Sequence, residues 1–367
     1  MSYFEKVYLN LIKIVIHQRF YRVYYVCGFI LILGVYWMIT VHFHKTLRAY
    51  DENRIPKKKE ESCHVSRKDD GLPLLHTNDS MPEKSIFFLE TSCKGGLSSR
   101  QACAVESAAR AHPDHQINVL FTSAVTREKL DASYLVTLTN HYKNVKLARV
   151  YVEDYANGTP LALPVKQMLS HDNYVHISDV MKFLTMYKYS GIYLGFDAVV
   201  ARSFSGLWKN WAIRETPVAL SSEMFSFSRN KVGRKLAELA VSSFLNEFSI
   251  TKEQNLWSYN GLSVLTNVLQ TWCSTTQVQV MSLATCDDLA VYGPELFYPI
   301  SFYDRQTYFN AAVLGAWKDQ RIYTYFVWER FTKHNMMNRA SLFWKIATEY
   351  CPMVSSRYGR DLGLIEP

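Results

Sequence analysis

Short apolar runs alternate with amphipathic stretches from residue 85 onward. Continuous apolar runs indicate buried strands, and apolar positions spaced by three and four residues indicate helices. After residue 207 the periodicity is weaker, but it still indicates helices at residues 232–248, 261–271 and 340–350. Such alternation is typical of a mainly parallel α/β sheet flanked by helices. Before residue 207 the pattern predicts strands at residues 86–89, 118–122, 145–152 and 192–194, and helices at residues 98–111, 126–142 and 178–189.

A different pattern precedes this region. Residues 23–43 contain no Asp, Glu, Lys or Arg. As a helix rising about 1.5 Å per residue, this stretch is about 31 Å long, which matches the hydrocarbon core of a bilayer. The residues that follow are bulky, unlike those at a signal-peptide cleavage site. The sequence therefore predicts an uncleaved transmembrane signal anchor at 23–43 after a cytosolic tail at 1–22. Lys and Arg on the two sides do not decide its orientation.

Residues 44–84 combine charges of both signs with few large apolar residues, and Pro56, Pro73 and Pro82 interrupt them. Such a segment cannot form a core of its own. We interpret it as a lumenal stem, and residues 85–367 as the folded domain. With 48% hydrophobic and 20% charged residues overall, the chain can bury a large core, which excludes disorder and coiled coil. The net charge of +8 is mild for this length and does not indicate a nucleic-acid-binding protein.

Six cysteines lie outside the predicted anchor, an even number that an oxidising lumen could pair. We hypothesise local disulfides between Cys93 and Cys103 and between Cys273 and Cys286. Reduced, buried thiols are the alternative. Two glycosylation acceptors, at Asn78 and Asn157, are compatible with a lumenal glycoprotein.

The loop after the strand at 192–194 is the place to look for chemistry, because ligands of open parallel sheets bind beyond the carboxyl ends of strands. There the chain reads Gly195-Phe196-Asp197, and Asp179 and Lys182 stand at the start of the preceding helix. A carboxylate, a lysine and a helix start could hold a divalent cation and a diphosphate. The simpler alternative is that Asp197 is a turn or capping residue.

Several further blocks extend this region into an ordered set. They are Phe88-Leu89-Glu90-Thr91-Ser92, Cys103-Ala104-Val105-Glu106-Ser107, His112-Pro113, Ser178-Asp179, Gly191-Ile192-Tyr193-Leu194, Phe297-Tyr298-Pro299-Ile300, Val327-Trp328 and Tyr350-Cys351-Pro352. In this order and spacing, the blocks resemble the α-1,4-glycosyltransferase family. The resemblance covers roughly residues 85–355.

The resemblance implies a single-pass type II Golgi membrane protein with a lumenal nucleotide-sugar-binding domain of the GT-A fold. Members transfer galactose or an N-acetylhexosamine from a UDP-sugar, with retention of configuration, to a terminal sugar of a glycolipid or glycoprotein in α-1,4 linkage. The implied setting is glycosphingolipid biosynthesis and lipid metabolism. The implied partners are the UDP-sugar donor, the glycan acceptor, the Golgi membrane, and a second copy or another transferase.

By the same resemblance, Thr91, Asp179, Lys182, Tyr193 and Asp197 contact the nucleotide-sugar, and Asp197 binds Mn²⁺ or Mg²⁺. The family motif is Asp-x-Asp, so its first carboxylate is absent here.

The chain departs from the family at other site positions too. Lys182 replaces an Arg, Ser221-Ser222-Glu223 replaces Asn-Gly-Ala, and Phe326 replaces the His of His-Val-Trp-Asn. Glu223 and Asp172 are candidates for the catalytic carboxylate or for a substitute metal ligand.

Three functions stay open on this basis: an active transferase, a catalytically silent relative that binds a partner transferase or a glycan, and a structural membrane glycoprotein. Loss of two metal contacts could lower the rate by a factor on the order of 10³, because each interaction with a charged group contributes about 1.5–3 kcal/mol. Four tryptophans in the loops are candidates to line an acceptor site, namely Trp208, Trp211, Trp257 and Trp328.

Overall fold

The computed structural model describes eight segments of the chain, all of which belong to one compact unit, Glu61–Pro367. They are residues 63–66, 70–76, 79–131, 133–170, 177–216, 218–247, 261–310 and 318–364. None of the helices within these segments is long and apolar enough to cross a membrane. The predicted tail at 1–22 and anchor at 23–43 lie outside the described residues.

A seven-stranded sheet in the order β3-β2-β1-β4-β7-β6-β8 runs through the unit. All neighbouring strands are parallel except at β7, which is antiparallel to both β4 and β6. The predicted mainly parallel α/β sheet is therefore confirmed. The strands are β1 (Ser85–Glu90), β2 (Gln116–Phe121), β3 (Val145–Arg149), β4 (Gly191–Leu194), β6 (Trp211–Thr216), β7 (Ala219–Phe227) and β8 (Ala290–Tyr292).

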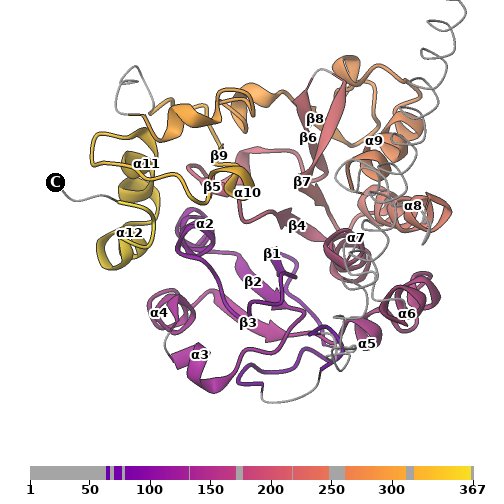
Figure 1. Cartoon of the computed structure of the whole chain (residues 1–367). Coiled ribbons are helices and arrows are strands. Elements are labelled where there is room, and N and C mark those ends of the chain that lie inside the picture. Colours follow the sequence, from indigo (N-terminus) through magenta and orange to yellow (C-terminus); the bar gives the residue numbers. More distant parts are fainter. Residues whose placement is uncertain are drawn as a thin grey trace, which may run out of the picture. The chain divides into compact units, whose positions relative to one another are not determined.

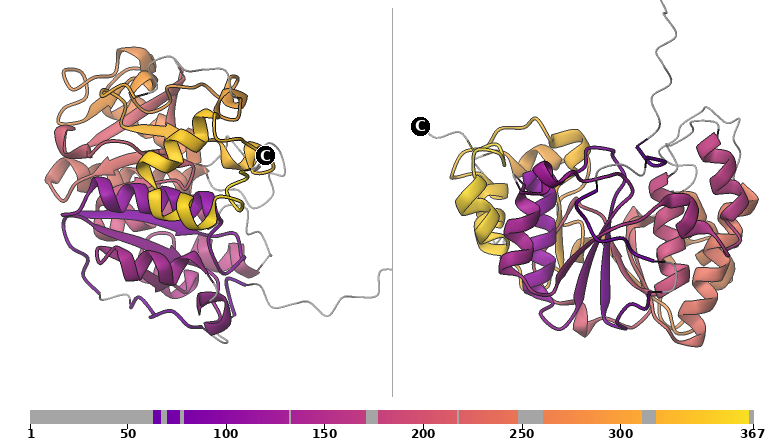
Figure 2. Two further views of the ribbon diagram at one scale, coloured as in Figure 1. Left: turned by 90° about the vertical axis from the view of Figure 1, so that its left-hand side faces the viewer. Right: turned by 90° about the horizontal axis from the view of Figure 1, so that it is seen from below.

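Helices cover both faces of the sheet (Figures 1 and 2). One face carries α2 (Ser99–Ala111), α4 (Tyr134–His141), α11 (Leu342–Tyr350) and α12 (Pro352–Tyr358). The other face carries α5 (Val152–Ala156), α6 (Ala162–Ser170), α7 (Ile177–Tyr189), α8 (Lys231–Glu247) and α9 (Gly261–Trp272). Two separate hydrophobic clusters form the core, one under each helical layer. Alternate residues of β1 supply them: Phe88 packs in one cluster and Phe87 in the other.

The connection from α7 to β4 shows how the sequence directs the chain toward the site. Ser190 ends the helix with a left-handed backbone (φ 57°), and its N–H donates to the carbonyl of Met186. Gly191 follows at φ 114°, where a Cβ would lie 2.6 Å from the carbonyl oxygen of Ser85 on β1. Only glycine fits there, so Gly191 lets β4 pair closely with β1.

Two of the predicted elements differ from the structure. The helix expected at 126–142 is two helices, α3 (Arg127–Asp131) and α4. The break occurs because the Ser133 side chain accepts the N–H of Leu135 and caps a new helix. The strand expected at 145–152 ends at Arg149, and α5 begins at Val152.

A second, two-stranded sheet was not predicted from the sequence. It joins β5 (Ala198–Val200) to β9 (Thr324–Phe326). Three-residue strands are too short to produce a periodic pattern. Through this pairing, the segment after the candidate Asp197 is held against the C-terminal part of the chain.

The disulfides connect distant segments. Cys273 pairs with Cys286, as hypothesised. The hypothesised Cys93–Cys103 pair is wrong: Cys93 pairs with Cys63, and Cys103 on α2 pairs with Cys351 before α12. Spacing alone could not reveal these pairs, because the folding of α12 against α2 brings Cys351 to Cys103.

Part of the predicted stem packs against the fold. Asp70 forms a 2.9 Å ion pair with the buried Arg149 of β3. Leu74 forms a parallel bridge with the same residue, and Leu72 is buried. Together with the Cys63–Cys93 disulfide, these contacts move the start of the folded unit from the predicted residue 85 to Glu61.

Candidate functional site

The candidate site lies at the carboxyl ends of β1 and β4. Thr91 follows β1 directly, and Gly195-Phe196-Asp197 follows β4. Antiparallel β7 brings Glu223 to the same place, because the N–H of Gly195 donates to the carbonyl of Glu223 at 2.7 Å. The helix α7 adds Asp179 and Lys182 from its first two turns.

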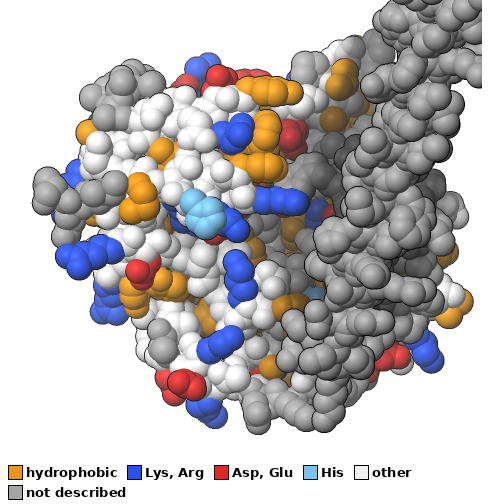
Figure 3. All heavy atoms as spheres, in the orientation of Figure 1, with side chains coloured by type: hydrophobic (Ala, Val, Ile, Leu, Met, Phe, Trp, Pro, Cys, Tyr) orange, Lys and Arg blue, Asp and Glu red, His pale blue; other side chains and the backbone are white. Residues whose placement is uncertain are grey.

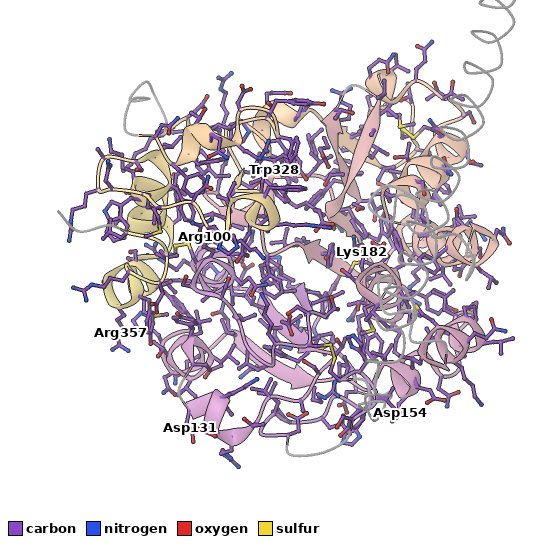
Figure 4. All side chains as sticks on the ribbon, viewed as in Figure 1. Arg100, Asp131, Asp154, Lys182, Trp328 and Arg357 are labelled. Carbon is purple, nitrogen blue, oxygen red and sulfur yellow. A yellow bond between two sulfur atoms is a disulfide. The ribbon has the colours of Figure 1, made fainter. Side chains whose placement is uncertain are left out.

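Lys182 connects these groups. Its side chain is 1% exposed, and its Nζ lies 3.2 Å from both Oδ1 of Asp179 and Oε1 of Glu223. Nζ also donates to Oγ of Ser222 at 3.3 Å and lies 5.3 Å from the ring centroid of Tyr193. Burial alone would lower the pKa of Lys182, but the carboxylates of Glu223 and Asp179 raise it above its ordinary value. The ammonium is therefore fixed in its charged form (Figure 4).

Glu223 occupies the space that the absent family carboxylate would need. A Cβ built on Gly195 would overlap Oε2 of Glu223 and lie 3.5 Å from its Cβ. An aspartate at 195 and the present position of Glu223 therefore exclude each other. The end of β4 therefore has glycine where the family has a carboxylate, and the Glu223 carboxylate from β7 occupies the position that a Cβ at 195 would take.

Asp197 holds the start of the short helix α10 (Glu329–Thr332). Its carboxylate accepts the backbone N–H of Glu329, and its backbone carbonyl accepts the N–H of Val327 at 2.8 Å. Burial, followed by the nearby carboxylates of Glu329 and Glu223, raises the pKa of Asp197 to about 8. Asp197 therefore lies next to the start of α10 in a strongly acidic environment.

This raised pKa predicts a pH-dependent stability in the metal-free protein. An ordinary aspartate in the unfolded chain ionises near pH 4, whereas Asp197 in the fold retains its proton up to about pH 8. Its contribution is therefore fully present below pH 4 and is lost as the pH rises to 8. We expect the melting temperature of Asp197→Asn, relative to the native chain, to increase steadily from pH 4 to pH 8. A constant difference across this range in thermal melts with EDTA would contradict the raised pKa.

The carboxylates at the site are of the kind that binds divalent cations, but among the described residues no three of these side chains bring their oxygens within 4.8 Å of one another, so cation binding requires them to move closer. Burial and Glu223 also raise the pKa of Glu215 on β6, to about 7. A cation would relieve the mutual repulsion of such carboxylates, and carboxylate oxygens are the donors that Mg²⁺ and Mn²⁺ prefer. Among the described residues around the site, the acidic groups outnumber the basic ones; they are Asp179, Asp197, Glu215, Glu223 and Glu329, against Lys182 and Arg100.

Three further residues from the sequence analysis do not join this group of charged side chains. Thr91 is half-buried after β1 and has no polar contact in common with Lys182 in the described part of the chain. Asp172 lies outside the described residues. Phe326 is a core residue, 3% exposed, whose ring packs on those of Tyr298 and Trp328, so it provides no ligand.

The four tryptophans considered for an acceptor site lie in different places. Trp211 is buried in the core, and Trp257 lies outside the described residues. Trp208 precedes the amino end of β6, so it lies at the opposite ends of the strands from the site. There its Nε1 donates to Asp288. Only Trp328, next to Glu329, is close to the candidate site (Figure 4).

Sequence reasoning missed three charged residues. Glu329 is the last residue of the block in which Phe326 replaces the family's His, but it was not singled out, and Glu215 has no motif around it. They come to the site through the β5–β9 and β6–β7 pairings. Arg100 on α2 is 4% exposed and donates to the carbonyls of Thr332, Asn335 and Leu362. These hydrogen bonds stabilise the segment that carries Glu329. The sequence could not predict this role, because an arginine on one face of a helix has no distinctive pattern around it.

Two family descriptions match the chain. Residues 98–217 match the glycosyltransferase sugar-binding region containing the DXD motif, and residues 230–358 match the α-1,4-glycosyltransferase conserved region. The first of these spans the site's Asp179, Lys182 and Asp197, although the motif itself reads Gly195-Phe196-Asp197 here.

Named relatives agree with this match. The rat lactosylceramide 4-α-galactosyltransferase is 27% identical over 281 residues, which cover 73% of this chain and 74% of the relative. The human α-1,4-N-acetylglucosaminyltransferase is 24% identical over 234 residues, covering 62% and 66%. Among solved structures, the PaToxG glycosyltransferase aligns with 51% of this chain and 69% of its own at 18% identity and a TM-score of 0.40. By these family descriptions and named relatives, the chain is similar to the α-1,4-glycosyltransferases over most of the described unit.

Proposed function

We propose that the protein is an active, retaining hexosyltransferase. It transfers galactose or an N-acetylhexosamine from a UDP-sugar to a terminal sugar of a glycolipid, or of a glycoprotein, in α-1,4 linkage. The observation that carries the proposal lies at the end of β4. Gly195 stands where the family has its first carboxylate, and the carboxylate of Glu223 occupies the space next to it.

The site residues have separate roles in this proposal. Asp197 and Glu223 hold Mn²⁺ or Mg²⁺, and the cation, when bound, neutralises the charge that develops on the leaving diphosphate. Lys182 turns from Glu223 toward the diphosphate, and Asp179 and the ring of Tyr193 keep its ammonium in place. Thr91 contacts the nucleotide from the end of β1.

The reaction breaks the bond from the sugar's anomeric carbon to the diphosphate oxygen and forms one to the acceptor's 4-hydroxyl oxygen. The acceptor's proton leaves to a base, for which Glu223 and Asp172 are the candidates; the departing diphosphate could also take it.

The proposed setting is the Golgi membrane, with a single span at 23–43 and the sheet domain in the lumen. The uncharged stretch at 23–43 supports the span, and three disulfides in the described part support an oxidising lumen. The strand order, with one antiparallel strand beside β4, supports the GT-A fold. Asn157 is exposed after α5 and open to glycosylation, whereas Asn78 lies outside the described residues.

A transfer assay tests the proposal. The full-length protein is incubated with lactosylceramide and, in turn, UDP-galactose, UDP-N-acetylgalactosamine or UDP-N-acetylglucosamine, with Mn²⁺. We expect one donor to give an α-1,4-linked product, and Asp197→Ala to abolish it. A well-folded protein that binds no UDP would favour the silent relative, and co-purification of another transferase would then identify its partner.

A further inference from the structure

An exposed group of aromatic side chains adjoins the site and has no part in the core. Tyr303 is 88% exposed and Phe331 is 44% exposed, although large aromatic side chains are usually buried. The ring of Phe302 contacts both, at centroid distances of 5.7 and 5.0 Å. We call Phe302, Tyr303, Arg305 and Phe331 the aromatic platform. Hydrophobic side chains reach the surface beside Lys or Arg side chains in the upper part of the face in Figure 3.

Arg305 makes the platform rigid. Its guanidinium carbon lies 4.1 Å from the centroid of Phe302 and 5.7 Å from that of Phe331. Its Nη1 donates to the carbonyl of Phe302 at 2.7 Å. The rings and the arginine therefore stand in a fixed arrangement before any ligand arrives, which lowers the entropy lost on binding.

The platform is continuous with the carboxylate cluster. Phe331 lies on α10, two residues after Glu329, and Asp197 accepts the N–H of Glu329. The ring of Phe302 also contacts Trp328, at 5.3 Å. Trp328 directly precedes Glu329, so the platform contacts the segment that carries Glu329.

Two buried donors at the base of the platform have no hydrogen-bond partner in the described part of the chain: Nε of Arg305 and Nε1 of Trp328. Buried polar atoms are normally paired, and each exception is destabilising. Both need acceptor oxygens. The ring planes of Tyr303 and Phe331 stand at 75° and 78° to that of Phe302, so Tyr303 and Phe331 each offer a separate ring face. A ring face beside donors matches a hexose ring, which has an apolar C–H face and hydroxyl groups around its edge.

We propose that the aromatic platform binds the terminal hexose of the acceptor glycan, with its C–H face on Tyr303 and Phe331 and its hydroxyl groups toward Arg305. Calling this glycan the acceptor rests on the proposed function, but binding of the glycan does not require transfer. A membrane surface is the other occupant that exposed rings and arginines could suit. The position beside Glu329 and the two unpaired donors favour the sugar.

Saturation-transfer NMR on the full-length protein tests this, with octyl β-lactoside and octyl β-N-acetylglucosaminide as probes. We expect at least one probe to bind, and Tyr303→Ala and Phe331→Ala each to weaken it about tenfold. Tyr303→Trp should retain binding. The affinity for UDP should not change in any variant. Trp208→Ala removes an equally exposed ring at the opposite sheet edge and should have no effect.

Three results would overturn the proposal: absence of binding of either probe, equal binding by the alanine variants and the native chain, or an equal loss in Trp208→Ala. Vesicles of phosphatidylcholine and phosphatidylserine form the second arm. If Tyr303→Ala loses vesicle binding and keeps glycoside binding, the platform contacts membrane instead. If glycosides bind through the platform but no UDP-sugar is used, the proposed function fails and the glycan site stands.

Discussion

Gly195→Asp should inactivate the protein while Glu223 is present, and should be tolerated once Glu223 is shortened. The Cβ of the new aspartate would overlap Oε2 of Glu223, and a third carboxylate would join Asp197 and Glu223. Because Oε2 is the tip of a side chain that is 38% exposed, Glu223 can rotate away from the new Cβ, and the main effect is that its carboxylate is displaced from Lys182. Glu223→Ala alone should lower kcat/KM by a factor on the order of 10–10², because it removes one charged contact to the cation, which contributes about 1.5–3 kcal/mol. The double variant Gly195→Asp/Glu223→Ala should recover most of that loss.

Two matched variants distinguish the effect of the added side-chain volume at position 195 from the effect of the added charge. Gly195→Ala adds the overlapping Cβ without a carboxylate, so it should lose stability and retain part of the activity. Gly195→Asp/Glu223→Gln keeps the crowded side chain and should remain inactive. The measurements are urea unfolding and kcat/KM for all five variants and the native chain. The native chain, Gly195→Asp, Glu223→Ala and their double variant form a double-mutant cycle. Additive effects at positions 195 and 223 would show that Glu223 does not stand in for the missing aspartate.

Lys182→Met should produce the largest loss of stability among the site variants. It leaves Asp179 and Glu223 without their shared counter-charge, and Lys182 itself is 1% exposed. Because the two remaining carboxylates are 19% and 38% exposed and partly hydrated, we expect a destabilisation of about 1–3 kcal/mol. The same change removes the cation proposed to hold the diphosphate, so UDP affinity should also fall by about tenfold or more.

Lys182→Arg is the control for this prediction, because the family has an arginine here. It keeps the charge and adds a second donor pair, so we expect stability within about 1 kcal/mol of the native chain and UDP binding to be preserved. Urea unfolding and UDP titration give both quantities. A Lys182→Met protein with native stability and native UDP affinity would mean that the ammonium neither braces the site nor meets the nucleotide.

The first half of the sheet could be predicted because its strands and helices alternate with clear apolar periods. β1, β2, β4, α2 and α7 were all indicated by the sequence, and so was the edge of the sheet where Asp179, Lys182 and Asp197 meet. Local patterns are sufficient for this, since consecutive β and α elements of parallel sheets lie next to one another.

The rest of the site depends on pairings that no local pattern encodes. Glu223 reaches Gly195 because β7 runs antiparallel to β4 with Leu194 opposite Met224. Glu329 arrives through the short β5–β9 sheet. The Cys103–Cys351 disulfide spans 248 residues, so it too required the tertiary fold. Glu223 was suspected only because it stands where the family has an uncharged residue, and its contact with Gly195 supplies the physical reason.

Calorimetric titration of UDP into the full-length protein, with and without Mn²⁺, tests the central claim most directly. Asp197→Ala and Glu223→Ala are titrated alongside the native chain, and the unfolding curve of each protein confirms its fold. We predict that UDP binds tightly only with Mn²⁺ and that either variant loses the Mn²⁺-dependent part of the binding. If Glu223→Ala folds and binds UDP with Mn²⁺ as the native chain does, the carboxylate from β7 has not replaced the one missing at Gly195, and the account is contradicted.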